Sequence, residues 1–322
     1  MTTPPTFWNL PDLVMRNIFN RVGLKSIINL RKVCRDLRNR IDDIKPEAIL
    51  SSVHIHVDDL QVQFCYYSDV EDRVEYERKS DRIVVRSDRS EKIVNDDFVE
   101  LASRDFQQIL KFQESIRMIE FFKLTAYTNK FLQFLETLKS FLASENRFLK
   151  VRDLNIYNID EKLVIKAFSL IDPRSINSIA FFDSDERMLP DLTEIMKMEH
   201  WKTATSFNSN YSFTHVSAHN FRHFSSVQLL LWSPSVEDLL DYKKIFQNST
   251  EAKDFMIRYE TFEDREQFLE KMGPTFGHLE RFFRMSSTDD YVLRISLGSP
   301  PDAFMFNRVP VADVPKHAVI QD

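Results

Sequence analysis

Glycine is scarce in this sequence, with four residues among 322, where proteins usually have about 7%. A phosphate-binding P-loop and a dinucleotide-binding fingerprint each need several glycines within a few positions, because their backbone N–H groups must approach phosphate closely. No Gly-x-Ser-x-Gly nucleophile elbow occurs either. The sequence therefore excludes the common motifs of nucleotide binding and of serine-hydrolase chemistry.

Cysteine and long apolar runs are also lacking. Cys34 and Cys65 are the only two cysteines, too few for a disulfide framework or a four-cysteine zinc site, which indicates a reducing compartment. The apolar runs are far shorter than the ~20 residues that span a bilayer. We therefore expect a cytoplasmic protein, with the nucleus as a second compartment, and no membrane partner.

The composition indicates packed domains. Hydrophobic residues make up 43% of the chain and aromatic residues 12%, and phenylalanine alone accounts for 28 residues. At roughly 150 residues per domain, this length predicts about two domains. The formal net charge of −6 disfavours binding to nucleic acid, and we expect no such partner.

Histidines and carboxylates offer weak candidates for chemistry. His54 and His56 fall on one face of a predicted strand, and three further histidines follow at four-residue spacing: His215, His219 and His223. Zinc sites usually need three or four ligands, and this second group lacks the acid of a His-Glu-x-x-His motif. Adjacent acids such as Asp58 and Asp59 occur in polar stretches typical of turns. We expect no metal, no cofactor and no catalytic residue.

The pattern of apolar residues predicts an α/β chain. Residues 51–97 alternate like strands of a meander, with the charged stretch Asp69–Lys79 as a loop or an edge. Strands and helices then alternate at a period of about 25 residues, which is within the range of leucine-rich repeats. Predicted strands are Ile119–Leu124, Leu154–Ile159, Ile176–Phe182, Ala204–Asn208, Val227–Trp232, Phe255–Phe262, Leu279–Met285, Tyr291–Leu297 and Ala303–Val309. Predicted helices between them include Phe98–Gln113, Glu161–Ile171, Leu189–Glu199, Val236–Gln247 and Glu263–Met272.

The first fifty residues predict a small helical segment. Leu10, Pro11 and Asp12 suit the start of a helix, which Gly23 would end. A second helix would place six apolar residues on one side and four basic residues mostly on the other. The apolar residues are Ile27, Leu30, Val33, Cys34, Leu37 and Ile41, and the basic ones are Arg31, Lys32, Arg35 and Arg38. Because so short a segment cannot bury all its apolar surface, we expect a protein partner.

The same segment resembles the F-box. The resemblance rests on Leu-Pro at Leu10–Pro11 and Val-Cys at Val33–Cys34, and one departure is Leu37, where the family usually has tryptophan. It implies an all-helical F-box that binds the adaptor of a cullin–RING (SCF-type) ubiquitin ligase. The implied adaptor-binding residues are Leu10, Pro11, Ile18, Phe19, Ile27, Leu30, Val33, Cys34 and Leu37.

The remainder of the chain is similar to the FTH domain, which follows the F-box in nematode proteins of the F-box A type. The runs that carry this likeness are Leu170–Ile179, Glu199–Ala204, Phe221–Leu229, Ser235–Phe246 and Val292–Leu297. The implied organisation is an F-box at 7–50, a β-rich connecting segment at 51–97, a leucine-rich-repeat-like β/α FTH domain at 98–310 and a tail at 311–322.

The function implied is that of a non-catalytic subunit that recruits a target protein to a ubiquitin ligase. The open strand face of the β/α body is the predicted target-binding surface, although a register slip of one residue would exchange the two faces. Its candidate residues are Asn155, Tyr157, Phe182, Trp232, Arg258 and Glu260. Two alternatives are a scaffold or decoy that binds the adaptor without promoting ubiquitination, and an enzyme with a barrel-like β/α body.

Overall fold

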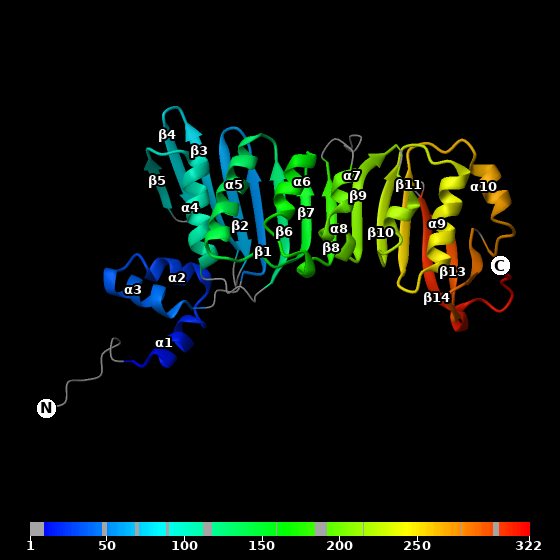
Figure 1. The fold of residues 1–322 in the computed structure, drawn as a ribbon, viewed down its shortest axis with the longest axis horizontal. Helices are drawn as coiled ribbons and strands as arrows, with labels where there is room; N and C mark the ends of the chain where they lie inside the picture. Colours follow the sequence, from blue (N-terminus) through cyan, green and yellow to red (C-terminus); the bar gives the residue numbers. More distant parts are fainter. Residues whose placement is uncertain are drawn as a thin grey trace. The chain divides into compact units, whose positions relative to one another are not determined.

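The computed structural model describes residues 10–46, 50–67, 71–87, 90–111, 118–158, 160–183, 192–214, 216–277, 279–298 and 303–322. The chain divides into two compact units, and Figure 1 labels their helices and strands. The first unit comprises Met1–Leu154 and Lys162–Ser175, and the second comprises Asn155–Glu161 and Ile176–Asp322.

Three helices begin the first unit: α1 (Asp12–Phe19), α2 (Leu24–Leu30) and α3 (Arg35–Ile44). The expected start of α1 is confirmed, with Pro11 at the N-cap and Asp12 in the first turn. Gly23 caps the start of α2 instead of the end of α1. Met15 and Phe19 are fully buried, and these two residues, four apart, give α1 its core-facing stripe.

The prediction of one long second helix is wrong, because the chain breaks between α2 and α3. Cys34 is extended, with φ −155° and ψ 166°, and its Sγ accepts a hydrogen bond from the Leu37 backbone N–H at 3.4 Å. An N-cap of this kind satisfies an amide that has no partner within the helix. Arg31, in the turn, forms a two-pronged ion pair with Asp42 of α3, at 2.7 and 2.8 Å. The Cys34 cap and the Arg31–Asp42 ion pair therefore stabilise the break between α2 and α3.

The first unit also contains a sheet. Five strands form an antiparallel meander, and the first of them pairs in parallel with a sixth. The strands are β1 (Ser52–Val57), β2 (Gln61–Tyr67), β3 (Glu71–Lys79), β4 (Arg82–Ser87), β5 (Ser90–Val94) and β6 (Ile119–Ala126). The strand-rich character expected for residues 51–97 is confirmed.

The charged stretch expected as a loop or edge is instead β3, which pairs on both sides. Tyr76 of β3 is buried, and its hydroxyl donates to Asp105 at 2.7 Å. Burial and the nearby Asp105 carboxylate raise the pKa of Tyr76 well above its usual value. Glu77 pairs with Arg86 on the neighbouring strand. Cross-strand pairing of opposite charges offsets the weak strand preference of charged residues.

Aromatic rings join this sheet to its helices. Phe64 of β2 lies 5.2 Å from Phe106 of α4 (Phe98–Lys111) and 5.7 Å from Phe134 of α5 (Lys130–Ser144), measured between ring centroids. All three rings are fully buried. Two further elements cross the unit boundary along the chain, β7 (Val151–Tyr157) and α6 (Glu161–Phe168).

The second unit is a mixed sheet. Its parallel part consists of β8 (Ser178–Phe182), β9 (Ser206–Phe213), β10 (Ser226–Leu231) and β11 (Asp254–Tyr259). Antiparallel β14 (Ala303–Pro310), β13 (Thr288–Gly298) and β12 (Arg281–Met285) continue it. The short β15 (Ile320–Gln321) pairs with β12 at the end of the strand order.

The α/β class is thus confirmed, with N-terminal helices and a mixed sheet. A leucine-rich-repeat solenoid is not shown, because three antiparallel strands follow the parallel ones. Nor is the sheet closed into a barrel, since β15 does not pair with β8. Parts of several predictions lie outside the described residues: 7–9, 47–49, 69–70, 112–113, 159, 189–191 and 215.

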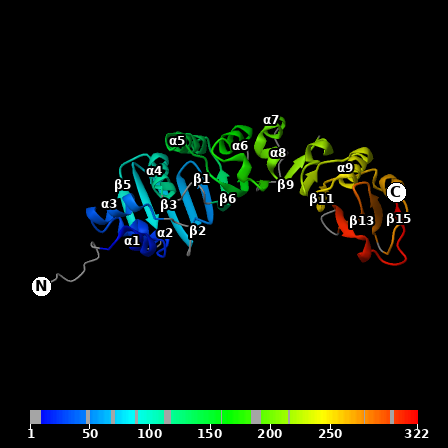
Figure 2. The same cartoon turned by 60° about the horizontal axis from the view of Figure 1, so that its bottom comes forward.

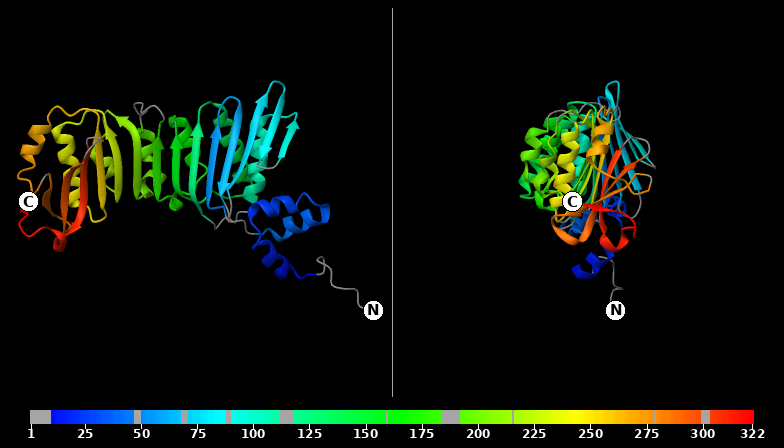
Figure 3. Two further views of the ribbon diagram at one scale, coloured as in Figure 1. Left: turned by 180° about the vertical axis from the view of Figure 1, so that it is seen from behind. Right: turned by 90° about the vertical axis from the view of Figure 1, so that its right-hand side faces the viewer.

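Helices of the second unit lie on one side of its strands (Figures 2 and 3). They are α7 (Thr193–Lys197), α8 (Glu199–Thr203), α9 (Val236–Asn248) and α10 (Arg265–Lys271), with a 3-10 turn, η3, at Ala218–Phe221. Phe207 of β9 packs 4.8 Å from Trp201 of α8 and 5.7 Å from Phe221 of η3. Residues alternate along β9 and β11, so the positions between the buried ones face away from the helices. Within the described residues, no helix has the length and apolarity needed to span a bilayer.

The aromatic cluster predicts a large loss of stability on truncation. Phe207→Ala should lower the free energy of unfolding by about 3–5 kcal/mol, because it removes a fully buried ring and leaves a cavity. The measurement is urea denaturation followed by tryptophan fluorescence. Trp232→Ala, at a site 49% exposed, should cost under about 1 kcal/mol. Equal losses for the two variants would contradict this account of the core.

Candidate interaction surfaces

The N-terminal helices leave large apolar side chains in solvent. Leu13, Val14 and Ile18 of α1 and Val33 of the α2–α3 turn are exposed, and Leu13 and Val33 reach 69%. Val14 and Ile18 are four residues apart and share a stripe of α1 next to the buried stripe of Met15 and Phe19. We call these four residues, Leu13, Val14, Ile18 and Val33, the exposed apolar set. Side chains of this kind in solvent mark a surface suited to protein contact.

The predicted adaptor-binding residues fall into three groups by exposure. Pro11, Ile18, Val33 and Cys34 are exposed, Leu10 and Leu30 are half-buried, and Phe19, Ile27 and Leu37 are buried. The buried three hold the helices together. Sequence reasoning did not include Leu13 and Val14, although both lie in the apolar run that opens α1. Sequence alone could not show which stripe of α1 is buried by the rest of the chain.

Two residues of the predicted basic helix face, Arg31 and Arg38, make contacts within the helical segment. Arg31 is bound to Asp42, and Arg38 donates to the Arg31 carbonyl at 3.0 Å. Arg40 pairs with Asp12 in the first turn of α1. These contacts tie α1 and the α2–α3 turn to α3, so Arg31 is a structural residue in this segment.

The six predicted target-binding residues all belong to the second unit. Tyr157 and Phe182 come together, with ring centroids 5.0 Å apart, and burial raises the pKa of Tyr157. Trp232 and Glu260 directly follow Leu231 and Tyr259, which are paired in register. Their positions are therefore adjacent at the ends of two neighbouring strands.

Arg258 has a structural contact that the sequence did not reveal. The pairing of β9 with β10 shifts between Gln228 and Leu230, because β9 carries a bulge there. The Arg258 guanidinium donates to the Ser209 carbonyl in this bulge at 3.1 Å. Asn210 of the bulge makes two hydrogen bonds of 2.8 Å with the backbone of Asp183. Asn155, the sixth predicted residue, is half-buried on β7.

The histidines make different contacts, although His219 and His223 line the same hollow. His54 packs edge-on against Tyr67 and Phe121, and burial lowers its pKa. His56 lies 3.4 Å from the Asp58 carboxylate. His223 is bound to the Trp201 carbonyl, and His215 is outside the described residues. No group of three or more histidines, cysteines or acids in the described part of the chain is arranged to hold a metal ion.

Two protein-family models match the chain. The F-box domain model matches residues 7–47, and the FTH domain model matches residues 132–272. Neither a curated protein nor a solved structure matches it. The helical segment with the exposed apolar set is therefore an F-box, and much of the β/α region is an FTH domain. The chain is an F-box protein of the kind that carries an FTH domain after its F-box.

The cap at Cys34 generates a prediction. Cys34→Ala should destabilise α3 relative to Cys34→Ser by about 0.5–1 kcal/mol, because serine keeps a side-chain acceptor at the N-cap and alanine has none. Amide hydrogen exchange at Leu37 reports this difference directly, since its N–H is the donor. As a control, Cys65→Ser on β2 should leave exchange in α3 unchanged. Equal protection of Leu37 in both Cys34 variants would argue against the cap.

Proposed function

We propose that this protein is a substrate-recruiting subunit of an SCF-type cullin–RING ubiquitin ligase. The F-box binds the adaptor of the ligase, and the FTH domain binds a target protein. The observation that carries the proposal is the exposed apolar set, Leu13, Val14, Ile18 and Val33, within the segment matched by the F-box model.

The energetics favour adaptor binding through this set. Apolar surface removed from water contributes about 25 cal/mol per Å², and Leu13 and Val33 in particular keep 69% of their surface in solvent within the F-box itself. The segment remains folded because Met15, Phe19 and Ile27 are fully buried. Its exposed residues are thus available to a partner without unfolding the helices.

The target side of the proposal rests on the strand face that turns away from the helices. Aromatic residues are the usual anchors of protein contacts, and this face has Trp232, Tyr157 and Phe182 at strand ends. Glu260 adds a charge beside Trp232. Arg258 would act there as support, because its guanidinium is bound to the β9 bulge.

The protein itself would form no covalent bond in this role. It would raise the local concentration of target lysines near the ubiquitin-loaded enzyme, because one chain holds both the adaptor and the target. Its proposed contribution to the reaction is therefore proximity alone. The FTH domain, whose strands and helices alternate with a leucine-rich-repeat-like spacing, would serve as the rigid support of the target-binding face.

A double charge substitution tests adaptor binding. Leu13→Asp with Val33→Asp should lower co-purification of the adaptor at least tenfold, because each carboxylate would have to be desolvated at the contact. Both sites are exposed, so circular dichroism and thermal unfolding should match the wild type. Leu60→Asp, at a site 61% exposed outside the F-box, is the matched control and should bind normally. Undiminished adaptor binding by the double variant would refute the assignment.

A second experiment tests target binding. The Leu13→Asp, Val33→Asp variant, which should not bind the adaptor, is used to capture proteins from cells. Mass spectrometry of the captured proteins should identify targets that the ligase no longer degrades. Adding Trp232→Ser and Glu260→Arg to this variant should abolish capture of those proteins, because the two positions are adjacent on the proposed target-binding surface.

The control is Phe148→Ser, at an exposed aromatic site of the first unit, which should keep the captured set. Capture that survives Trp232→Ser and Glu260→Arg would argue against this face. Captured proteins whose half-lives do not depend on the F-box would favour the scaffold or decoy alternative over recruitment to a ligase.

A further inference from the structure

A tryptophan and a glutamate occupy adjacent positions at the ends of β10 and β11, two strands that Figure 1 shows side by side. Trp232 directly follows β10 and is 49% exposed. The pairing continues past Leu231, because the Thr261 backbone N–H donates to the Trp232 carbonyl at 3.0 Å. Trp232 is therefore held beside Glu260, which is also exposed. Neighbouring strands lie about 4.8 Å apart, so one side chain of a partner can contact both residues.

The turn after β11 is acidic. Residues 260–266, which we call the acidic turn, contain four acids and one base, and all five charged side chains are exposed: Glu260, Glu263, Asp264, Glu266 and Arg265. Two cations of neighbouring elements are bound elsewhere, since Arg258 donates to the Ser209 carbonyl at 3.1 Å and Lys271 pairs with Glu237 at 3.3 Å. Four acids against one base give the acidic turn a formal charge of −3.

Aromatic contacts hold the acidic turn in place. The ring centroid of Phe262 lies 5.5 Å from that of Tyr259, 5.9 Å from that of Phe268 and 5.9 Å from that of Phe304. These three partners belong to β11, α10 and β14, and all three are buried. Phe262 therefore fixes the acidic turn to the core of the second unit. A surface fixed in this way loses little conformational entropy when a partner binds.

We propose that Trp232 and the acidic turn bind a basic segment of the target protein, one that presents lysine or arginine side chains. The face of an indole ring attracts a cation more strongly than that of any other aromatic side chain. Glu260, one strand away, pairs with the same cation, and the other acids of the turn attract neighbouring basic residues of the target. A neutral segment lacks this charge complementarity, and an acidic one is repelled. The proposal rests on the target-binding role given above to the FTH domain, and it names the chemistry of the partner.

Fluorescence anisotropy of labelled peptides, titrated with the full chain, tests this charge preference. The probe is a capped peptide of three Ala-Arg-Ala-Lys repeats, and two matched peptides have glutamine or glutamate at every basic position. We expect saturable binding of the basic peptide, binding at least tenfold weaker for the neutral one and none for the acidic one. The affinity for the basic peptide should fall as salt is added, because interactions between exposed charges are screened.

Substitutions at the two adjacent positions locate the binding. Glu260→Lys should weaken binding of the basic peptide about tenfold, because it replaces an attraction by a repulsion. Trp232→Leu should weaken it about fivefold, and Trp232→Phe should weaken it less, because phenylalanine keeps a ring face for the cation. The charge-matched control is Asp289→Lys, at an exposed site near the end of β13 that lies away from the acidic turn. This control should change the affinity less than twofold.

Equal binding of the basic and neutral peptides, or the same loss in Asp289→Lys as in Glu260→Lys, would overturn the proposal, as would the absence of saturable binding. Adaptor co-purification should be normal in all four variants, which separates this result from the F-box test. If Trp232→Ser with Glu260→Arg abolishes target capture but the basic peptide does not bind, the target-binding face stands and its preference for a basic segment is wrong.

Discussion

The contact between aromatic side chains of the sheet and those of the helices is the constraint on which each unit depends. Phe64 packs on Phe106 and Phe134 in the first unit, and Phe207 packs on Trp201 and Phe221 in the second. A buried aromatic ring removes some 150–250 Å² from water, so these contacts decide which strand face carries the helices. Because side chains alternate along a strand, the other face is left for hydrogen bonds and for partners.

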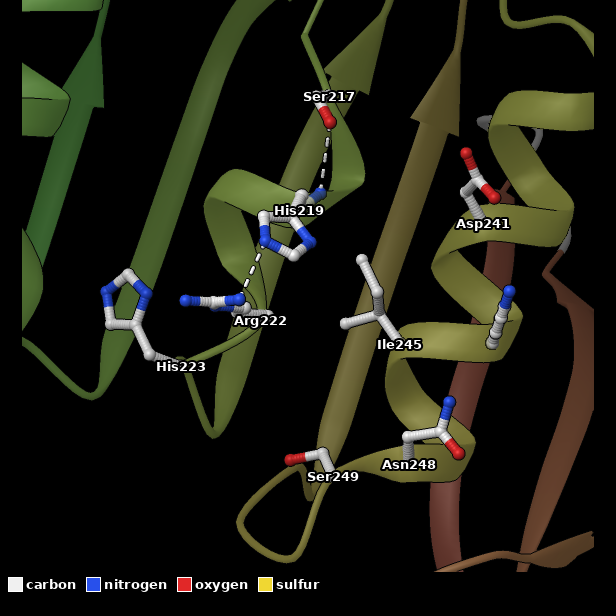
Figure 4. Close-up of a pocket in the computed structure, with 9 residues that line it drawn as sticks. Ser217, His219, Arg222, His223, Asp241, Ile245, Asn248 and Ser249 are labelled. Atoms are coloured by element: carbon white, nitrogen blue, oxygen red, sulfur yellow. Dashed lines mark hydrogen bonds between the residues drawn. The ribbon is translucent and has the colours of Figure 1, made fainter.

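The polar features follow from this division. On the strand face away from the helices, Arg258 ties β11 to the bulge of β9, and Trp232 remains half exposed. On the helix side, the η3 segment and α9 border an open hollow whose lining includes His219 and Asp241 (Figure 4). The F-box shows the same division into a buried and an exposed face, since one stripe of α1 is buried and the neighbouring stripe is exposed.

Much of the fold could be predicted where a single pattern dominates. The alternation in β1, β10 and β11 and the apolar spacing of α4 and α9 indicated these elements correctly. β3 was missed because its charges suggest a loop, whereas Glu77 and Arg86 neutralise each other across strands. The break before α3 was missed because an apolar spacing that continues through Cys34 does not reveal an extended backbone there.

The sequence by itself determined the domain order, through Leu-Pro and Val-Cys spacing and the runs similar to the FTH domain, because these are local patterns. Only the tertiary structure decided which F-box residues face solvent: Leu13 and Val33 are exposed, whereas Phe19 and Leu37 are buried. It alone also placed Trp232 beside Glu260, 28 positions apart in the chain, through the pairing of β10 with β11. Exposure and proximity depend on how helices pack on one another and on a sheet, and a linear spacing of residue types does not contain that information.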